Sequence, residues 1–144
     1  MAKTRKPKRK YNSTRRQEQA RETRRHVIEA ARQLFIENGY AGATIDAIAR
    51  EAGVAPETIF ATFGSKRAIL AAVIDVAVGG DDQPTPLLQR PEPQAVLQQT
   101  EPVQLLQLFS ADISDILERV APMFVVMRVA AKTEPEIADR KSVV

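Results

Sequence analysis

The chain has 144 residues and 44% hydrophobic content, which suits one globular domain or a small domain with part of another. It has no cysteine, which excludes disulfides, thiolate metal sites and cysteine nucleophiles, and its net charge is only +3. The longest apolar run, residues 68–74, is far shorter than the roughly 20 residues that span a bilayer, so we expect no membrane segment and a cytoplasmic location.

The first segment in chain order is strongly basic. Residues 1–25 hold eleven lysines and arginines against two glutamates, a net charge of +9, whereas the other residues carry a net charge of −6. A segment with so little apolar surface does not fold alone, so we predict a basic disordered arm over residues 1–22. Clustered cations bind phosphate by releasing counterions, and we expect the arm to add affinity for DNA. A solvated tail without a partner is the alternative.

Residues 23–78 have the apolar periodicity of four helices around one small core. The first predicted helix runs to about Glu37 and stops at Asn38-Gly39, the second covers about 44–52, the third about 56–62, and the fourth begins after Ser65. The predicted core comprises Leu34, Phe35, Ile45, Ile48, Ile59, Phe63, Ile69, Leu70, Val73, Ile74 and Ala77.

The second and third predicted helices have the pattern of a helix-turn-helix. The second carries one apolar stripe, with Thr44 placed as its N-cap. Gly53 reaches the left-handed conformation that ends a helix at little cost, and Val54 fits the angle between the two helices. Pro56 suits the first turn of the third helix, which is then oriented to enter a major groove of DNA. We therefore predict a DNA-binding domain.

The sequence changes character after Val78. Residues 79–102 contain five prolines and predict a stiff linker or loop in which helix is blocked repeatedly. An amphipathic stripe then runs from Leu106 to Val120, Pro122 is expected to break that helix, and another helix is expected to begin near residues 133–136. The predicted fold class is all-α.

Several motifs in one order resemble the TetR-type transcriptional regulators of bacteria. They are Ala30-Ala31-x-x-Leu34-Phe35, Asn38-Gly39-Tyr40, Thr44-Ile45-x-x-Ile48-Ala49-x-x-Ala52-Gly53-Val54 and Thr58-Ile59-Phe60-x-x-Phe63-x-Ser65-Lys66. The resemblance implies a repressor that binds a palindromic operator in double-stranded DNA as a homodimer and is released by a small-molecule effector. It also implies that the three-to-four-helix DNA-binding domain precedes a regulatory domain, of which residues 103–144 would be an incomplete part with ligand-binding and dimerisation roles.

The resemblance implies DNA contacts at positions of the second, third and fourth predicted helices, and two arginines join them from the basic segment. These residues are Thr44, Ala55, Pro56, Glu57, Thr58, Phe60, Ala61, Thr62, Lys66, Arg24 and Arg25.

The chemistry at these positions leaves specific alternatives open. Thr44 is expected to hold a phosphate or to act only as a cap, and Lys66 to hold a phosphate or to be solvated. Glu57 is expected to accept from a cytosine amino group or to pair with a neighbouring arginine. The family often has tyrosine, an aromatic residue and histidine where this chain has Phe60, Ala61 and Thr62, so we expect Phe60 and Phe63 mainly in the core and Thr62 at a phosphate.

Enzymatic functions find no support in the sequence. His26 is the only histidine and has no imidazole partner for a metal and no nucleophile to serve, so we predict no catalysis, no cofactor and no metal. Two other functions remain open. One is a nucleoid-type protein that binds DNA with little sequence preference, and the other is a short interaction partner of a longer regulator. Activation of transcription is also not excluded.

Overall fold

The computed structural model describes residues 10–138, which form helices and connecting segments without a strand. The elements are α1 (Lys10–Gly42), α2 (Ile45–Ala52), α3 (Pro56–Phe63), α4 (Lys66–Gly79), a short 3-10 helix η1 (Leu87–Gln89), α5 (Pro91–Gln98), α6 (Pro102–Thr133) and α7 (Pro135–Ala138). The predicted all-α fold is confirmed. None of these helices is both long enough and apolar enough to cross a membrane.

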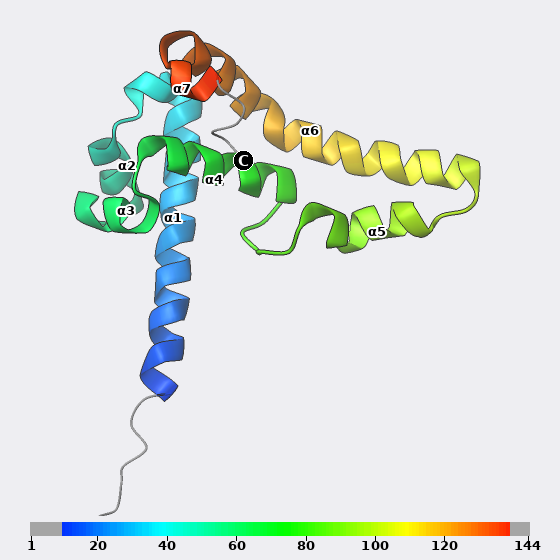
Figure 1. Ribbon diagram of the computed structural model, residues 1–144, viewed down its shortest axis with the longest axis horizontal. Helices are drawn as coiled ribbons and strands as arrows, with labels where there is room; N and C mark the ends of the chain where they lie inside the picture. The colour runs from blue at the N-terminus through cyan, green and yellow to red at the C-terminus, as the bar shows by residue number, and fades with distance from the viewer. Residues whose placement is uncertain (1–9, 139–144) are drawn as a thin grey trace, which may run out of the picture.

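The helices are arranged around the C-terminal half of α1 (Figure 1). Helices α2, α3 and α4 pack beside this half, and the C-terminal part of α6 crosses it together with α7. Helix α5 lies alongside the N-terminal part of α6, and this helical pair extends away from the other helices. The N-terminal half of α1, drawn in blue, projects in a different direction beyond α2, α3 and α4.

One hydrophobic core joins the helix-turn-helix region to the end of α6. Phe35, Ile48, Ile59 and Ile69 are almost completely buried in it, as the apolar periodicity predicts. Other predicted members lie at its edge and are only partly buried: Leu34, Ile45, Phe63 and Ile74. Helix α6 contributes residues that the sequence does not assign to this core, namely Met123, Val126 and Ala130. The predicted DNA-binding domain and the C-terminal part of α6 therefore share one interior.

Backbone and side-chain caps fix the bounds of the short helices. Thr44 accepts a hydrogen bond from the Ala47 N–H at the start of α2, and Ser65 does the same for Ala68 in α4. Gly53 adopts φ 70° at the end of α2, where its N–H and that of Val54 bond back to carbonyls of the last turn. These two bonds form a Schellman motif, which sets the angle between α2 and α3.

The prediction of a disordered arm up to residue 22 is wrong where the structure describes it, because α1 begins at Lys10. The part of that arm over residues 1–9 lies outside the described residues. Residues 15–22 are mostly arginine, glutamine, glutamate and alanine, which are strong helix formers. Once Val27 and Phe35 anchor the helix, each further residue adds one backbone hydrogen bond at little cost. The regular helix is interrupted only at Gly39, whose φ is 73°.

The prolines interrupt helices less than predicted. Residues 79–102 are not only a loop, because η1 and α5 form within them. Pro91 and Pro93 occupy the first turn of α5, and Pro102 the first turn of α6, where a missing N–H costs no bond. Pro122 also fails to break α6, which is continuous from Pro102 to Thr133. The apolar neighbours of Pro122, which include Val120 and Met123, pack into the core and offset the roughly 3 kcal/mol that an interior proline costs.

Candidate nucleic-acid interface

Helix α3 is held by one side and exposed on the other. Ile59 is buried with an exposed fraction of 1%, and Phe63, one turn later, packs against the same core. Among the predicted DNA contacts in and before this helix, Pro56 and Thr58 are half-buried, whereas five are exposed: Ala55, Glu57, Phe60, Ala61 and Thr62. The helix can therefore present these side chains to a ligand while Ile59 and Phe63 keep it packed on the core.

The expectation that Phe60 lies mainly in the core is wrong. Its exposed fraction is 54%, and it is one of the large apolar side chains on the surface. Phe60 follows Ile59 directly, and one residue turns an α-helix by about 100°, so the two side chains point in different directions. Phe63 lies four residues after Ile59 and shares its face. An exposed phenyl ring beside Glu57 and Ala61 offers apolar contact, for instance to a thymine methyl group.

The hydroxyls of Thr44 and Thr62 differ in whether their proton is free to donate to a phosphate. Thr44 Oγ1 accepts from the Ala47 N–H at 3.1 Å, which leaves its own proton free to donate. Thr62 Oγ1 instead donates to the Thr58 carbonyl at 2.8 Å. A phosphate oxygen needs a donor, so Thr44 can act as cap and phosphate ligand together, whereas Thr62 must first break its bond to Thr58.

Glu57 has no ion-pair or hydrogen-bond partner among the side chains that the structure describes, and it is exposed in the first turn of α3. The alternative in which it pairs with a neighbouring arginine is thus not realised in this conformation. A negative charge near a helix N-terminus is favourable, which stabilises Glu57 where it stands. Its carboxylate is left able to accept hydrogen bonds only, the property that suits a cytosine amino group.

Lys66 turns toward the protein interior, which neither of the two expectations for it includes. Its Nζ donates to the Tyr40 carbonyl at 2.8 Å and lies 4.2 Å from the centroid of the Tyr40 ring. That ring stacks on Phe35, with centroids 5.6 Å apart. Burial lowers the pKa of Lys66, and the charge of Glu134 acts against this shift. Lys66 therefore ties the start of α4 to the C-terminal end of α1.

Arg24 and Arg25, the two arginines that the sequence analysis predicts as DNA contacts, have different partners in the structure. The guanidinium of Arg24 lies over the Phe63 ring, 4.5 Å from its centroid, and so reaches the C-terminal end of α3. Arg25 Nε lies 3.5 Å from a carboxylate oxygen of Asp82, in the loop after α4. The structure thus brings Arg24 to the candidate interface and directs Arg25 elsewhere. Contacts between these residues and DNA stay predictions.

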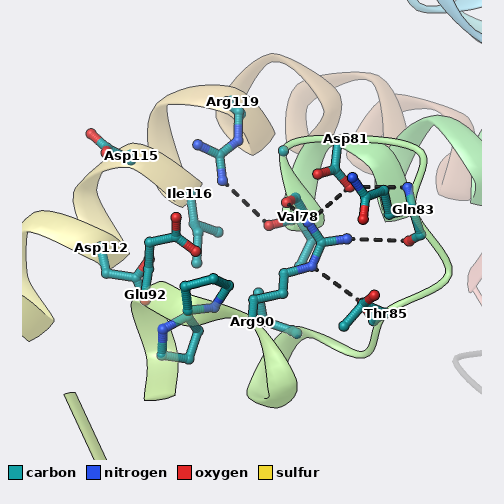
Figure 2. Close-up of a pocket in the computed structure, with 15 residues that line it drawn as sticks. Val78, Asp81, Gln83, Thr85, Arg90, Glu92, Asp112, Asp115, Ile116 and Arg119 are labelled. Atoms are coloured by element: carbon teal, nitrogen blue, oxygen red, sulfur yellow. Dashed lines mark hydrogen bonds and ion pairs between the residues drawn. The ribbon is translucent and has the colours of Figure 1, made fainter. Parts of the chain in front are cut away.

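A cavity of about 480 Å³ lies away from this interface, between the end of α4, the following loop, α5 and α6 (Figure 2). Two arginines that line it donate hydrogen bonds to backbone carbonyls. Arg90 donates to the carbonyls of Gly79, Gln83 and Thr85 and pairs with Asp81 at 2.8 Å. Arg119 donates to the carbonyls of Ala77 and Val78. Together they neutralise the carbonyl end of α4, which an ordinary helix leaves unsatisfied.

Three further carboxylates line the cavity beside apolar and neutral residues. Glu92, Asp112 and Asp115 lie along α5 and α6, and none of them has an ion-pair or hydrogen-bond partner among the described residues. No group of three or more histidine, cysteine or carboxylate side chains in the described range is arranged to hold a metal ion. The sequence analysis assigns no function to this region, because Arg90 and Arg119 stand 29 residues apart and only the fold unites them.

The comparisons with known proteins concern mainly the first half of the chain. Residues 27–73 match the model of the bacterial regulatory proteins of the tetR family. The HTH-type transcriptional regulator UidR of Escherichia coli is 38% identical over 58 residues, which are 40% of this chain and 30% of UidR. The uncharacterised HTH-type transcriptional regulator TtgW of Pseudomonas putida is 41% identical over 56 residues, 39% of this chain and 42% of TtgW. The match thus spans less than half of either relative.

A crystal structure extends the likeness of fold beyond the helix-turn-helix. The protein, from Mesorhizobium loti, is assigned to the TetR family of transcriptional regulators and superposes with a TM-score of 0.59 at 19% identity. The superposition covers 83% of this chain and 58% of that protein. The relatives matched in sequence are named as transcriptional regulators, which agrees with the predicted class of function. The N-terminal helix-turn-helix domain of the chain thus belongs to the TetR family of bacterial regulatory proteins.

Proposed function

We propose that the chain is a repressor that binds a palindromic operator in double-stranded DNA as a homodimer, in the bacterial cytoplasm, and that a small-molecule effector releases it. The exposed face of α3 carries this proposal. It presents Glu57, Phe60 and Ala61 on a helix whose angle to α2 is set by Gly53 and whose opposite side is buried through Ile59. A rigid exposed helix of this kind fits the major groove of B-DNA.

Apolar surface on α6 supports the homodimer. Leu106, Phe109, Ile113, Leu117 and Phe124 are spaced so that they lie along one side of this helix, and their exposed fractions range from 36% to 64%. A row of large apolar side chains in water marks an interaction surface, and a second copy would cover it. The twofold symmetry of such a pair matches the palindromic operator, because each recognition helix then reads one half-site.

The cavity supports an effector. Its volume suits a small molecule, and the unpaired carboxylates of Glu92, Asp112 and Asp115 favour one with cationic or hydrogen-bond-donating groups. Helix α4 connects the two sites, since it begins at Lys66 beside Tyr40 and ends in the cavity at Gly79. A ligand that moves the end of α4 would thus shift the helix-turn-helix, provided that it binds one position of α4 better than the other.

The experiment that tests this function starts from the duplexes that the wild-type chain enriches from a random-sequence DNA library. Thr44→Ala should weaken binding to every duplex, because it removes a phosphate contact, whereas Glu57→Ala should change preference at one base pair. Equal losses on all duplexes for both variants would contradict the base-reading role of Glu57. Lys66→Ala should also weaken binding on all duplexes, because it removes the bond to the Tyr40 carbonyl that ties α4 to the end of α1.

Two outcomes would favour the other functions that the sequence leaves open. Steeply salt-dependent binding without any enriched sequence would indicate a nucleoid-type protein. A monomer that pairs only with a longer relative would indicate an interaction partner. Sedimentation at micromolar concentration separates these outcomes from the proposed homodimer, whose dissociation constant should rise at least about tenfold in Leu117→Gln if one anchor is lost from the α6 surface.

A further inference from the structure

The N-terminal half of α1 is an exposed rod, and its residues 15–21 have no hydrogen bond, ion pair or ring contact with another helix in the described structure. Every side chain from Ser13 to Glu22 is exposed, and Figure 1 shows this part of α1 projecting past the other helices. Helices of globular proteins are stabilised mainly by packing an apolar face, which this segment lacks. What the rod offers to a partner is therefore its charged side chains.

The basic side chains of this rod continue the face that packs against the core. Arg21 precedes the buried Ile28 by seven residues, and Arg16 precedes the buried Val27 by eleven. These separations correspond to about two and three helical turns, so each arginine lies on the line of its buried counterpart. Arg24 marks the transition, because its guanidinium covers the Phe63 ring at the end of α3. The inward side of α1 thus changes from apolar to basic where it passes α3.

The acidic side chains lie on the other side of the same helix. Glu22 precedes the exposed Glu29 by seven residues, and Glu18 precedes Glu22 by four, so all three share one outward side. Arg15 lies on this outward side too, seven residues before Glu22. Arg16 and Arg21 have no ion-pair or hydrogen-bond partner among the described side chains, and their charges are available to a ligand.

We propose that the inward face of this rod, through Arg16 and Arg21 together with Arg24, binds the phosphate backbone of the duplex beyond the groove that α3 enters. The positive charge of the face favours a polyanion as its ligand. Because the face continues to the end of α3, this polyanion should be the DNA molecule that α3 contacts. Eight residues of helix rise by about 12 Å between Arg16 and Arg24. Phosphates follow at about 3.4 Å per strand, so the rod spans three to four of them. This inference rests on the proposed DNA binding and lengthens the operator that the chain contacts.

The test compares neighbouring arginines that carry the same charge but point about 100° apart around the helix, one on the inward and one on the outward side. Arg16→Ala and Arg15→Ala are measured with one duplex, a 40-base-pair sequence enriched by the wild-type chain, over a series of salt concentrations. Each lost phosphate contact lowers the slope of log K against log salt by about 0.9. We expect this loss for Arg16→Ala and Arg21→Ala, about twice the loss for the double variant, and almost none for Arg15→Ala. Circular dichroism checks that the helix remains.

Duplex length provides a second readout. Trimming the enriched duplex to the base pairs that α3 alone requires should weaken the wild-type chain and leave the Arg16→Ala/Arg21→Ala variant unchanged. Equal salt slopes for the Arg15 and Arg16 variants, or equal losses on trimming, would overturn the inference while leaving operator binding intact. A wild-type chain that enriches and binds no duplex would overturn the proposed function itself.

Discussion

The helix-turn-helix domain and the α5–α6 pair differ in how completely they bury their apolar side chains. In the domain, Phe35, Ile48 and Ile69 have exposed fractions of 0%. In α6, Leu106 and Leu117 keep 64% and 52% of their surface exposed. The first region contains the interactions that stabilise it, whereas the second presents a surface that only another molecule or segment can cover. The closed core and the exposed apolar surface of α6 thus lie in different parts of this chain.

The largest expected difference is between two alanine substitutions, one in each region. Phe35→Ala should cost about 3–5 kcal/mol of unfolding free energy, because it opens a cavity in a closed core, whereas Leu106→Ala should cost less than about 0.5 kcal/mol. Urea unfolding at low protein concentration measures both. A cost at Leu106 that grows with protein concentration would show that a second copy covers it, and equal costs at one low concentration would contradict the comparison.

The left-handed glycines allow a matched test of strain. Gly53 and Gly80 have φ of 70° and 80°, and an added Cβ would find no close neighbour at Gly53 and only ordinary contact at Gly80. Alanine at either position should therefore cost a similar backbone strain of roughly 1–2 kcal/mol. DNA binding should fall further in Gly53→Ala, because Gly53 sets the angle of α3. Titration of an enriched duplex checks this, and equal binding by both variants would disprove the special role of Gly53.

Lys66→Met should cost about 1–2 kcal/mol, because it leaves the half-buried Tyr40 carbonyl without its charged donor. Burial lowers the pKa of Lys66 below its usual 10.5. Between the lowered pKa and 10.5 the unfolded chain holds a proton that the folded chain has lost, so wild-type stability should rise with pH relative to Lys66→Met. Urea midpoints of the two proteins across this range measure the difference. A constant difference would contradict the burial of the ammonium.

The smallest effect is expected in the loop after α4. The Asp81 carboxylate accepts from the Gln83 N–H at 3.0 Å and pairs with Arg90, and these two contacts lower its pKa below the usual 3.8. The contacts are complete above pH 3.8 and are lost as pH falls through the lowered pKa. The NMR shift of the Gln83 amide should report a midpoint below 3.8 that is absent in Asp81→Asn. A midpoint at or above this value would mean that the loop is open in solution.

The helix-turn-helix was predictable from sequence because its determinants are local. Thr44, Gly53 and Pro56 each set a helix end within a turn of themselves, and Ile48 and Ile59 repeat at helical spacing with their apolar neighbours. The misses involve contacts between distant residues or extensions of a helix. Composition cannot show that Lys66 meets the carbonyl of Tyr40, or that the buried residues around Pro122 hold α6 together. Whether the predicted contacts of α3 touch DNA stays a prediction.

The turn between α2 and α3 has a consequence for how such a protein changes in evolution. Its two bonds run from the Gly53 and Val54 N–H groups to backbone carbonyls, so no side chain of α3 takes part in these bonds. The anchor on the core side is Ile59. Residues such as Glu57 and Ala61 are thus exchangeable at little expense in stability, since surface substitutions usually change it by no more than about 0.5 kcal/mol. Under the proposed function, single substitutions at these positions would change the binding specificity and leave the scaffold intact.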